Sequence, residues 1–259
     1  MKKIKIVGII PAHLDSIRYP KKIIKNIYEV PMIEHVRRRA KLSTYLKEIY
    51  VATNSNLIED LVIKNGGKVI KTKKIHRNGT SRCAEAATKI DCTHLIIIQG
   101  DEPLILPRQI NKLSKSIIMK PDIPVWNAVG ELKNKTELNK KTFVKCSIEK
   151  NDKINYFFRK TPAFSSFHLQ KKYIKKVLGI LAFKKKVLTN YPKIKKSIVE
   201  EQEFIEQMSI LTNNIDIYSC NISPCLPSVN LKKELNDVYK FIKTSNEQQK
   251  ILNKIGVII

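Results

Sequence analysis

Two adjacent carboxylates, Asp101 and Glu102, follow a short aliphatic run near the middle of the chain. Residues 95–98 are Leu-Ile-Ile-Ile, and Gln99 and Gly100 separate this run from the acids. The pattern is typical of a buried strand ending in a loop, and in open α/β sheets ligands bind at the carboxyl ends of strands. Either acid could ligate a hard cation such as Mg²⁺, which takes carboxylate and phosphate oxygens together. A turn with two solvated acids explains the same residues equally well.

The first 120 residues alternate between strand-like and helix-like patterns, and residues 11–26 form a polar, basic loop. Strands are expected at residues 4–10, 48–52, 68–70 and 95–98. Helix starts are expected at two prolines and two N-cap residues: Pro31, Ser55, Thr80 and Pro107. The first helix should bury an apolar stripe of Met32, Ile33, Val36 and Ala40, and Gly66 and Gly67 should end the second. This alternation predicts a parallel, doubly wound sheet.

Beyond residue 120 the pattern is less regular. We expect the strands of a mixed sheet at residues 125–129, 143–148, 154–158 and 177–183. A basic, irregular segment is expected at 162–175, and helices at 199–211 and 231–242. The sequence has no internal repeat and no low-complexity linker, which indicates that the two halves are continuous lobes.

Length and composition indicate a globular chain of enzyme size. The 259 residues are 42% hydrophobic, which is enough for a sizeable core and excludes a wholly disordered protein. No apolar run approaches the roughly 20 residues of a membrane helix. Residues 4–10 fit a first core strand better than a signal peptide, because Lys5 interrupts them and no small-residue cleavage site follows.

The charged residues and the cysteines favour a cytoplasmic protein with phosphate-bearing ligands. A net charge of +26 attracts polyanions, but the lysines are spread along the chain without a stripe interleaved with aromatics, so we expect no dedicated nucleic-acid binding. The five cysteines are odd in number, scattered and without a C-x-x-C pair. This favours reduced thiols over disulfides or a zinc site.

Four sequence blocks together resemble the cytidylyltransferases that activate 3-deoxy-manno-octulosonate (KDO). Residues 9–22, Ile-Ile-Pro-Ala-His-Leu-Asp-Ser-Ile-Arg-Tyr-Pro-Lys-Lys, are similar to the family's I-I-P-A-R-x-x-S-x-R-x-P-G-K. Residues 76–85 are similar to H-x-S-G-T-E-R-x-A-E, and residues 99–103 reproduce Q-G-D-E-P in full. Residues 203–208 resemble E-x-L-E-Q-L. The blocks are spread over nearly the whole chain.

The resemblance implies a nucleotide-sugar-transferase-like, Rossmann-like α/β fold with a mixed, mainly parallel sheet and a less regular dimerisation lobe. It implies one cytidylyltransferase domain over residues 1–259, with a nucleotide-binding half to residue 120 and a sugar-binding and dimerisation half from 121. The implied reaction couples CTP to an acidic ulosonate sugar, most simply KDO, for lipopolysaccharide or capsule synthesis. Mg²⁺ is the implied cofactor, and the enzyme is a cytoplasmic homodimer without membrane insertion.

The resemblance also assigns residues to roles. Arg18 and Lys22 would hold the triphosphate and stabilise departing pyrophosphate, while Asp101 would hold Mg²⁺ together with Asn230. Substrate-binding positions follow from the same blocks: His13, Ser16, Asn78, Thr80, Ser81, Arg82, Gln99, Glu206 and Gln207. Three further residues are weaker candidates for lining the sugar pocket: His76, Tyr156 and Arg159.

Several of these residues also have an ordinary structural interpretation. Thr80 can be only an N-cap, Arg82 a surface salt-bridge residue and Gln99 a strand-end hydrogen-bonding residue. The pair Glu206 and Gln207 can belong to an exposed helix face. A lone histidine such as His76 is more often structural than functional.

The chain departs from the family pattern at several positions. The residues that differ are His13 for arginine, Lys21 for glycine, Asn78 for serine, Ser81 for glutamate, Val177-Leu178-Gly179 for His-Ile-Gly, and Asn230 for a second Mg²⁺-binding aspartate. An amide at 230 offers the metal an oxygen without a charge. The departures leave two alternatives open: a CMP-activating enzyme for an amino-ulosonate or nonulosonate sugar, and a catalytically weakened nucleotide-binding protein.

Overall fold

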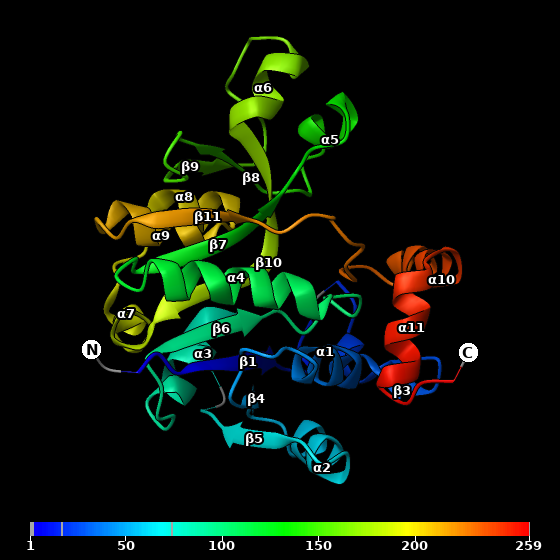
Figure 1. The fold of residues 1–259 in the computed structure, drawn as a ribbon. Coiled ribbons are helices and arrows are strands. Elements are labelled where there is room, and N and C mark those ends of the chain that lie inside the picture. The colour runs from blue at the N-terminus through cyan, green and yellow to red at the C-terminus, as the bar shows by residue number, and fades with distance from the viewer. Residues whose placement is uncertain (1–2, 17, 74, 259) are drawn as a thin grey trace.

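The sheet that organises the molecule runs through both halves of the chain (Figure 1). The structure is a computed structural model that describes residues 3–16, 18–73 and 75–258. Within these ranges nine strands form one sheet: β1 (Ile6–Ala12), β4 (Ile49–Thr53), β5 (Lys68–Lys71), β6 (His94–Ile98), β7 (Val125–Gly130), β8 (Lys145–Ile148), β9 (Ile154–Phe158), β10 (Ile174–Lys184) and β11 (Ile217–Asn221). A separate small hairpin pairs β2 (Asn26–Ile27) with β3 (Val30–Pro31).

The strand order is β11-β7-β10-β6-β1-β4-β5, with β8 and β9 continuing from one end of β10. Neighbours in this order are parallel except at β10, which is antiparallel to both β6 and β7. The predicted mixed, mainly parallel α/β sheet is therefore confirmed. In Figure 1 the strands stack from β5 at the bottom to β8 and β9 near the top. Residues 135–175, which include these two strands, are called the upper lobe.

Helices cover both faces of the sheet. They are α1 (Met32–Lys41), α2 (Asn56–Lys64), α3 (Gly79–Ala87), α4 (Pro107–Met119), α5 (Lys135–Asn139), α6 (Phe167–Tyr173), α7 (Lys185–Asn190), α8 (Ile198–Glu203), α9 (Glu206–Thr212), α10 (Glu234–Thr244) and α11 (Asn246–Lys254), with short 3₁₀ turns η1 (Lys22–Ile24) and η2 (Tyr191–Lys193). No helix within the described ranges is both long enough and apolar enough to cross a bilayer.

The central strands are apolar without alternation because both of their faces are buried. In β6, Leu95 and Ile97 pack with α3, α7 and α9, whereas Ile96 and Ile98 pack with α1, α2 and α4. Each side chain of the run therefore has a core to enter, which is the usual reason for a continuous aliphatic strand. The same division holds along β1, where Val7 and Ile9 face one layer and Ile6 and Ile10 the other.

Several local predictions are confirmed. The stripe of α1, from Met32 to Ala40, is fully buried at its four predicted apolar positions. The hydroxyl of Ser55 accepts a hydrogen bond from the amide of Ile58 at 3.4 Å and caps α2. Gly66 follows that helix with a φ of 68°, a left-handed conformation that glycine adopts without a Cβ penalty.

Other local predictions are wrong. Thr80 is not an N-cap, because Asn78 caps α3 and Thr80 lies inside the first turn. Residues 162–175 are not irregular throughout, since they contain α6. The helix predicted over 199–211 is two helices, α8 and α9, separated at Phe204 with a φ of 54°, and the helix predicted from 231 begins at Glu234. Apolar periodicity did not reveal these breaks because it continues across them.

The C-terminal helix α11 escaped prediction because it is rich in polar residues, yet two buried polar side chains help to attach it to the sheet domain. Arg39 of α1 is fully buried and donates to Gln248 Oε1 at 2.7 Å. Gln248 in turn donates from Nε2 to the carbonyl of Leu104 at 2.8 Å. Burial lowers the pKa of Arg39 to about 9, so the guanidinium depends on this amide.

Replacing Gln248 should therefore destabilise the fold. We expect Gln248→Leu to lower the free energy of unfolding by about 2–3 kcal/mol, because a buried charged donor loses its acceptor. Urea denaturation followed by circular dichroism measures the change. Gln249→Leu is the matched control, since Gln249 is half-buried and bonds only to carbonyls of α10. Equal losses in the two variants would show that the Arg39 contact does not hold α11.

Candidate active site

The carboxyl ends of β1 and β6 lie side by side because the two strands are parallel neighbours. The loops that leave them, after Ala12 and Ile98, border a cavity of about 340 Å³. Its walls are formed by Pro11, His13, Asp15, Ser16, Arg18, Lys22, Ile23, Gly79, Gln99, Gly100, Asp101 and Asn230. Seven residues assigned from the sequence blocks are among them: His13, Ser16, Arg18, Lys22, Gln99, Asp101 and Asn230.

Lys22 joins three separate segments at the floor of this cavity. Its ammonium donates to Asp101 Oδ2 at 2.6 Å and to the carbonyl of Val229 at 2.9 Å. The amide of Val229 donates to the carbonyl of Asp101, also at 2.9 Å. The loop after β1, the loop after β6 and the segment before α10 are therefore fixed to one another around a single positive charge.

Arg18 and Asn230 form a second contact across the same cavity. The guanidinium of Arg18 donates to Asn230 Oδ1 at 2.9 Å. Glu234 Oε2 accepts from the amides of Asn230 and Leu231 and so holds the Asn230 backbone at the start of α10. Residues far apart in sequence thus present two cations, one carboxylate and one amide to a common space.

The oxygens of Asp101 and Asn230 suit a hard cation. No group of three or more His, Cys, Asp or Glu side chains able to hold a metal is found in the described part of the chain. Mg²⁺ is usually held by one or two carboxylates and completes its octahedral shell with waters and phosphate oxygens, so two protein oxygens in an open cavity fit it. Lys22 and Arg18 contact these oxygens, and they carry the positive charge that a polyphosphate requires.

Glu102 belongs to a different environment from that of Asp101. A Cβ added at Gly179 would lie 2.6 Å from Glu102 Oε1, so this glycine of β10 makes room for the carboxyl group. Burial, reinforced by the adjacent Asp101 carboxylate, raises the pKa of Glu102 to about 8. Of the two acids, only Asp101 lines the first cavity.

A second cavity of about 390 Å³ adjoins the first and shares Arg18, Gln99, Asp101 and Asn230 with it. Its other walls come from the less regular half: Thr142, Phe143, Val144, Arg159, Lys176, Val177, Leu178, Gly179, Leu181, Phe204, Glu206, Gln207, Leu226, Ser228, Leu231 and Glu234, together with Glu102. The antiparallel strand β10 forms its apolar side. The sequence patterns did not mark Lys176 or residues 142–144, because these residues lie in or beside the strands expected at 143–148 and 177–183 and match no motif.

Glu206 and Gln207 line this second cavity and are held by hydrogen bonds with α3 and β7. Thr80 Oγ1 donates to Glu206 Oε1 at 2.8 Å, and Gln207 Nε2 donates to Asn127 Oδ1 at 3.1 Å. Burial raises the pKa of Glu206 to about 7; the hydrogen bond from Thr80 opposes this shift and the Glu200 carboxylate adds to it. Both side chains point into the fold, so the exposed-face interpretation is wrong.

The remaining predicted residues lie around the cavities rather than in their walls. Asn78 and Ser81 bond each other in a capping box, with Ser81 N donating to Asn78 Oδ1 at 2.8 Å. Arg82 is buried and donates to Thr72 Oγ1 at 2.7 Å, so it is no surface salt-bridge residue. His76 Nε2 lies 2.9 Å from Glu85 Oε2. Of this block only Gly79 lines the first cavity.

Comparison with known proteins decides the family. The Cytidylyltransferase family model matches residues 7–217. The chain is 36% identical over 243 residues to the 3-deoxy-manno-octulosonate cytidylyltransferase of Fusobacterium nucleatum. The match covers 93% of this chain and 98% of the relative. The chain belongs to the 3-deoxy-manno-octulosonate cytidylyltransferase family. The corresponding protein of Escherichia coli is 32% identical, with coverage of 87% and 91%.

Solved structures agree with this family. A CMP:2-keto-3-deoxy-manno-octonic acid synthetase complexed with CTP superposes with a TM-score of 0.86 at 31% identity, covering 92% of this chain and 98% of that one. The inositol-1-phosphate CTP transferase of T. maritima has a TM-score of 0.68 at 14% identity, covering 99% and 98%. This more distant likeness shows the shared nucleotidyltransferase fold alone.

Two departures of this cytidylyltransferase from its family preserve the backbone structure. The family's serine and glutamate in S-G-T-E have the spacing of a capping box, and here Asn78 and Ser81 close the same box at the start of α3. These departures therefore change the capping atoms and leave the helix start in place.

Two other departures do have structural consequences. Lys21 occupies the position of the family glycine with a φ of 56°, a left-handed conformation that costs a side-chain-bearing residue about 1 kcal/mol. His13 takes the place of an arginine at the first cavity, and burial together with Arg82 lowers the pKa of its imidazole. His13 is therefore mainly neutral at pH 7, so this wall carries one positive charge fewer than the family pattern.

The raised pKa of Glu206 predicts a pH-dependent stability. The folded protein binds the Glu206 proton more tightly than the unfolded chain does, so this contribution is complete below about pH 4.5 and is lost as the pH rises through 7. Glu206→Gln removes it. As the pH rises from 4.5 to 7.5, we expect the free energy of unfolding of Glu206→Gln to increase relative to that of the wild type by up to about 3 kcal/mol.

Urea denaturation across this pH range measures the effect. Glu201→Gln is the matched control, because Glu201 is an exposed carboxylate on the neighbouring helix α8. A wild-type minus Glu206→Gln difference that stays constant with pH would show that the Glu206 carboxyl group ionises normally in the folded protein.

Proposed function

We propose that this protein transfers the cytidylyl group of CTP to 3-deoxy-manno-octulosonate and releases pyrophosphate. The observation that carries the proposal is the junction of two cavities at Gln99, Asp101 and Asn230. One cavity has the cations for a triphosphate, and the other has the polar groups and apolar strand residues for an acceptor sugar. The substrates of the relatives named above supply the identity of both ligands.

CTP belongs in the first cavity. Arg18 and Lys22 would neutralise the triphosphate, Arg18 with a planar fork and Lys22 as a point charge. Gly79 places the start of α3 against the cavity, since a Cβ there would lie 3.3 Å from Gln99 Oε1 and 3.1 Å from Pro11 Cγ. Free amides at a helix start favour anions, and Gln99 can hydrogen-bond the base.

The acceptor belongs in the second cavity. Its anomeric hydroxyl attacks the α-phosphorus of CTP, a new phosphorus–oxygen bond forms, and the bond to the β-phosphate breaks with loss of pyrophosphate. Positioning and charge neutralisation supply most of the catalysis in such transfers. Glu206 and Gln207 would hydrogen-bond sugar hydroxyls from α9, and Arg159 lies at the rim with a positive charge for the acceptor carboxylate.

Asp101 and Asn230 are the residues that would hold Mg²⁺. The ion supplies charge compensation at phosphate oxygens when it is bound. Lys22 contacts Asp101 and orients that carboxylate toward the cavity. The residues that contact the triphosphate and those that contact the metal are therefore interleaved.

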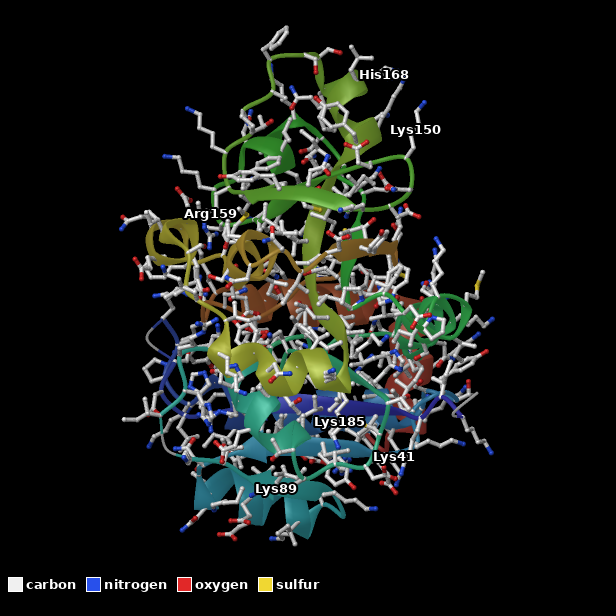
Figure 2. The ribbon with its side chains drawn as sticks, turned by 90° about the vertical axis from the view of Figure 1, so that its left-hand side faces the viewer. Lys41, Lys89, Lys150, Arg159, His168 and Lys185 are labelled. Carbon is white, nitrogen blue, oxygen red and sulfur yellow. The ribbon has the colours of Figure 1, made fainter. Side chains whose placement is uncertain are left out.

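We also propose a cytoplasmic homodimer built on the upper lobe. Four large apolar side chains of β9, α6 and the segment between them are exposed: Tyr156, Phe164, Leu169 and Tyr173. Figure 2 shows this lobe from the side, with His168 and Lys150 at its top. An exposed apolar patch of this kind marks an interface in a folded protein. The cysteines are all free, in agreement with a reducing compartment.

A second acceptor class is favoured by one feature of the second cavity. Val177 of β10 presents apolar atoms where the family's His-Ile-Gly begins with a hydrogen-bonding side chain, and the apolar Leu178 and Leu181 lie in the same wall. Such a wall suits an acceptor carrying an apolar substituent, as in an acylated amino-ulosonate or nonulosonate. The two acceptor classes share the carboxylate and the anomeric hydroxyl.

Pyrophosphate release tests the function. With CTP and Mg²⁺ we expect turnover of KDO or of one member of a panel of amino-ulosonates and nonulosonates. Asp101→Asn should reduce turnover at least about a hundredfold, because it removes the one metal-binding carboxylate. Asp122→Asn is the control, since Asp122 is exposed and pairs with Lys184. CTP binding without turnover of any acceptor would favour a weakened nucleotide-binding protein.

The Asn230 position gives a further prediction. We expect Asn230→Asp to lower the Mg²⁺ concentration for half-maximal activity, because a carboxylate replaces a neutral oxygen in the metal set. The Arg18 contact at 2.9 Å should persist as an ion pair. A Mg²⁺ titration of pyrophosphate release measures the shift. Coincident titrations for the two proteins would place residue 230 outside the metal site.

A further inference from the structure

Lys145 is a fully buried lysine whose charge has no carboxylate partner among the described residues. It lies on β8, and its ammonium donates to three backbone carbonyls: Lys140 at 3.0 Å, Phe143 at 2.9 Å, and Arg159. An ammonium has three N–H groups, so each of them has one acceptor. Burial lowers the pKa of Lys145 to about 8, and the Arg159 guanidinium acts in the same direction.

Burying a charge is unfavourable unless it is hydrogen-bonded, and these three carbonyls supply the hydrogen bonds. The three carbonyls belong to two segments that flank the end of the β8–β9 ladder, where Lys145 pairs with Phe158. One is the loop over residues 140–144, and the other is the chain immediately after β9. Lys145 therefore joins the two segments just beyond the point where the β8–β9 ladder ends.

Arg159 extends the same connection to the helices. Its Nε donates to the carbonyl of Glu203 at 2.8 Å, and a terminal nitrogen donates to the carbonyl of Lys141 at 3.2 Å. Figure 2 shows Arg159 where the upper lobe meets α8 and α9. Two cations thus use five carbonyls to join the 140–144 loop, the end of β9 and the break between α8 and α9.

All three segments line the second cavity. Thr142, Phe143 and Val144 come from the loop, Arg159 from the end of β9, and Phe204, Glu206 and Gln207 from the helix break and α9. Lys145 itself is not in the cavity wall. The first cavity contains no residue of these segments.

We propose that Lys145 is a positioning residue for the acceptor: by holding three carbonyls it sets the wall of the 390 Å³ cavity without touching the sugar. The proposal rests on the proposed function, because it takes this cavity as the acceptor site. The contacts of Lys145 also indicate which parts of the active site depend on it. Loss of Lys145 should disturb acceptor binding and leave the triphosphate site at Arg18, Lys22 and Asp101 in place.

The chain offers a closely matched control in Lys175. It is also a buried lysine of the upper lobe, and it lies opposite Cys146, the residue after Lys145, in the β8–β10 pairing. Its ammonium donates to Glu131 Oε2 at 2.8 Å and to the carbonyl of Lys171 at 2.9 Å. Neither partner lines the second cavity. Lys175→Met therefore reports the cost of losing a buried lysine from this lobe alone.

The experiment compares Lys145→Met with Lys175→Met and the wild type in three measurements. They are the KM for the acceptor, the dissociation constant of CTP, and amide hydrogen exchange over residues 140–144. For Lys145→Met we expect an acceptor KM raised about tenfold or more, CTP affinity within about twofold of wild type, and faster exchange in the loop. For Lys175→Met we expect none of these changes.

Any other outcome would contradict a specific claim. An unchanged acceptor KM and unchanged loop exchange in Lys145→Met would overturn the positioning role. If Lys145→Met loses CTP binding, the measurements are repeated with Lys145→Gln, which keeps an uncharged donor group. Loss of CTP binding in Lys145→Gln as well would show a general folding role and overturn the proposal. Absence of turnover in the wild type with every ulosonate would instead contradict the proposed function, while loop exchange still reports whether Lys145 orders the wall.

Discussion

The contact between Lys22 and Asp101 is the constraint on which the cleft depends. It forms at 2.6 Å between the loops that follow β1 and β6, and the same ammonium bonds the carbonyl of Val229. These loops meet because two parallel neighbouring strands end at one edge of the sheet. A triphosphate bound there would meet a lysine that the protein already holds in position, which lowers the cost of ordering it on binding.

Strand β10 explains why the active-site cleft has two chemically different halves. It is antiparallel to both β6 and β7, so it brings the less regular half of the chain across the carboxyl end of the parallel strands. Its register shifts between Val177 and Leu181, and Gly179 in that interval makes room for Glu102. The apolar side chains of this interval then form one wall of the second cavity, whereas the charged loops after β1 and β6 border the first.

The buried polar residues outside the triphosphate site share one function in the fold. Arg39 attaches α11 through Gln248, Thr80 bonds Glu206, and Lys145 holds three carbonyls of two nearby segments, so each connects separate parts of the fold. Such groups are costly when unpaired, which makes their partners specific. The fold consequently determines the geometry of α9 and of the 140–144 loop through polar contacts as well as through apolar packing.

The sequence alone determined the alternation of strands and helices in the first half, the buried stripe of α1, the acid-bearing turn after β6 and the family. These follow from local periodicity and from short blocks whose residues are close together in the chain. The tertiary structure decided which residues face the cavities. Asn78, Ser81 and Arg82 are capping or buried scaffold residues, whereas Lys176 and residues 142–144, which carry no local signal, line the second cavity. Contacts such as Arg18 with Asn230 join positions more than two hundred residues apart, and periodicity reports only the face of one element and not the partner that it meets.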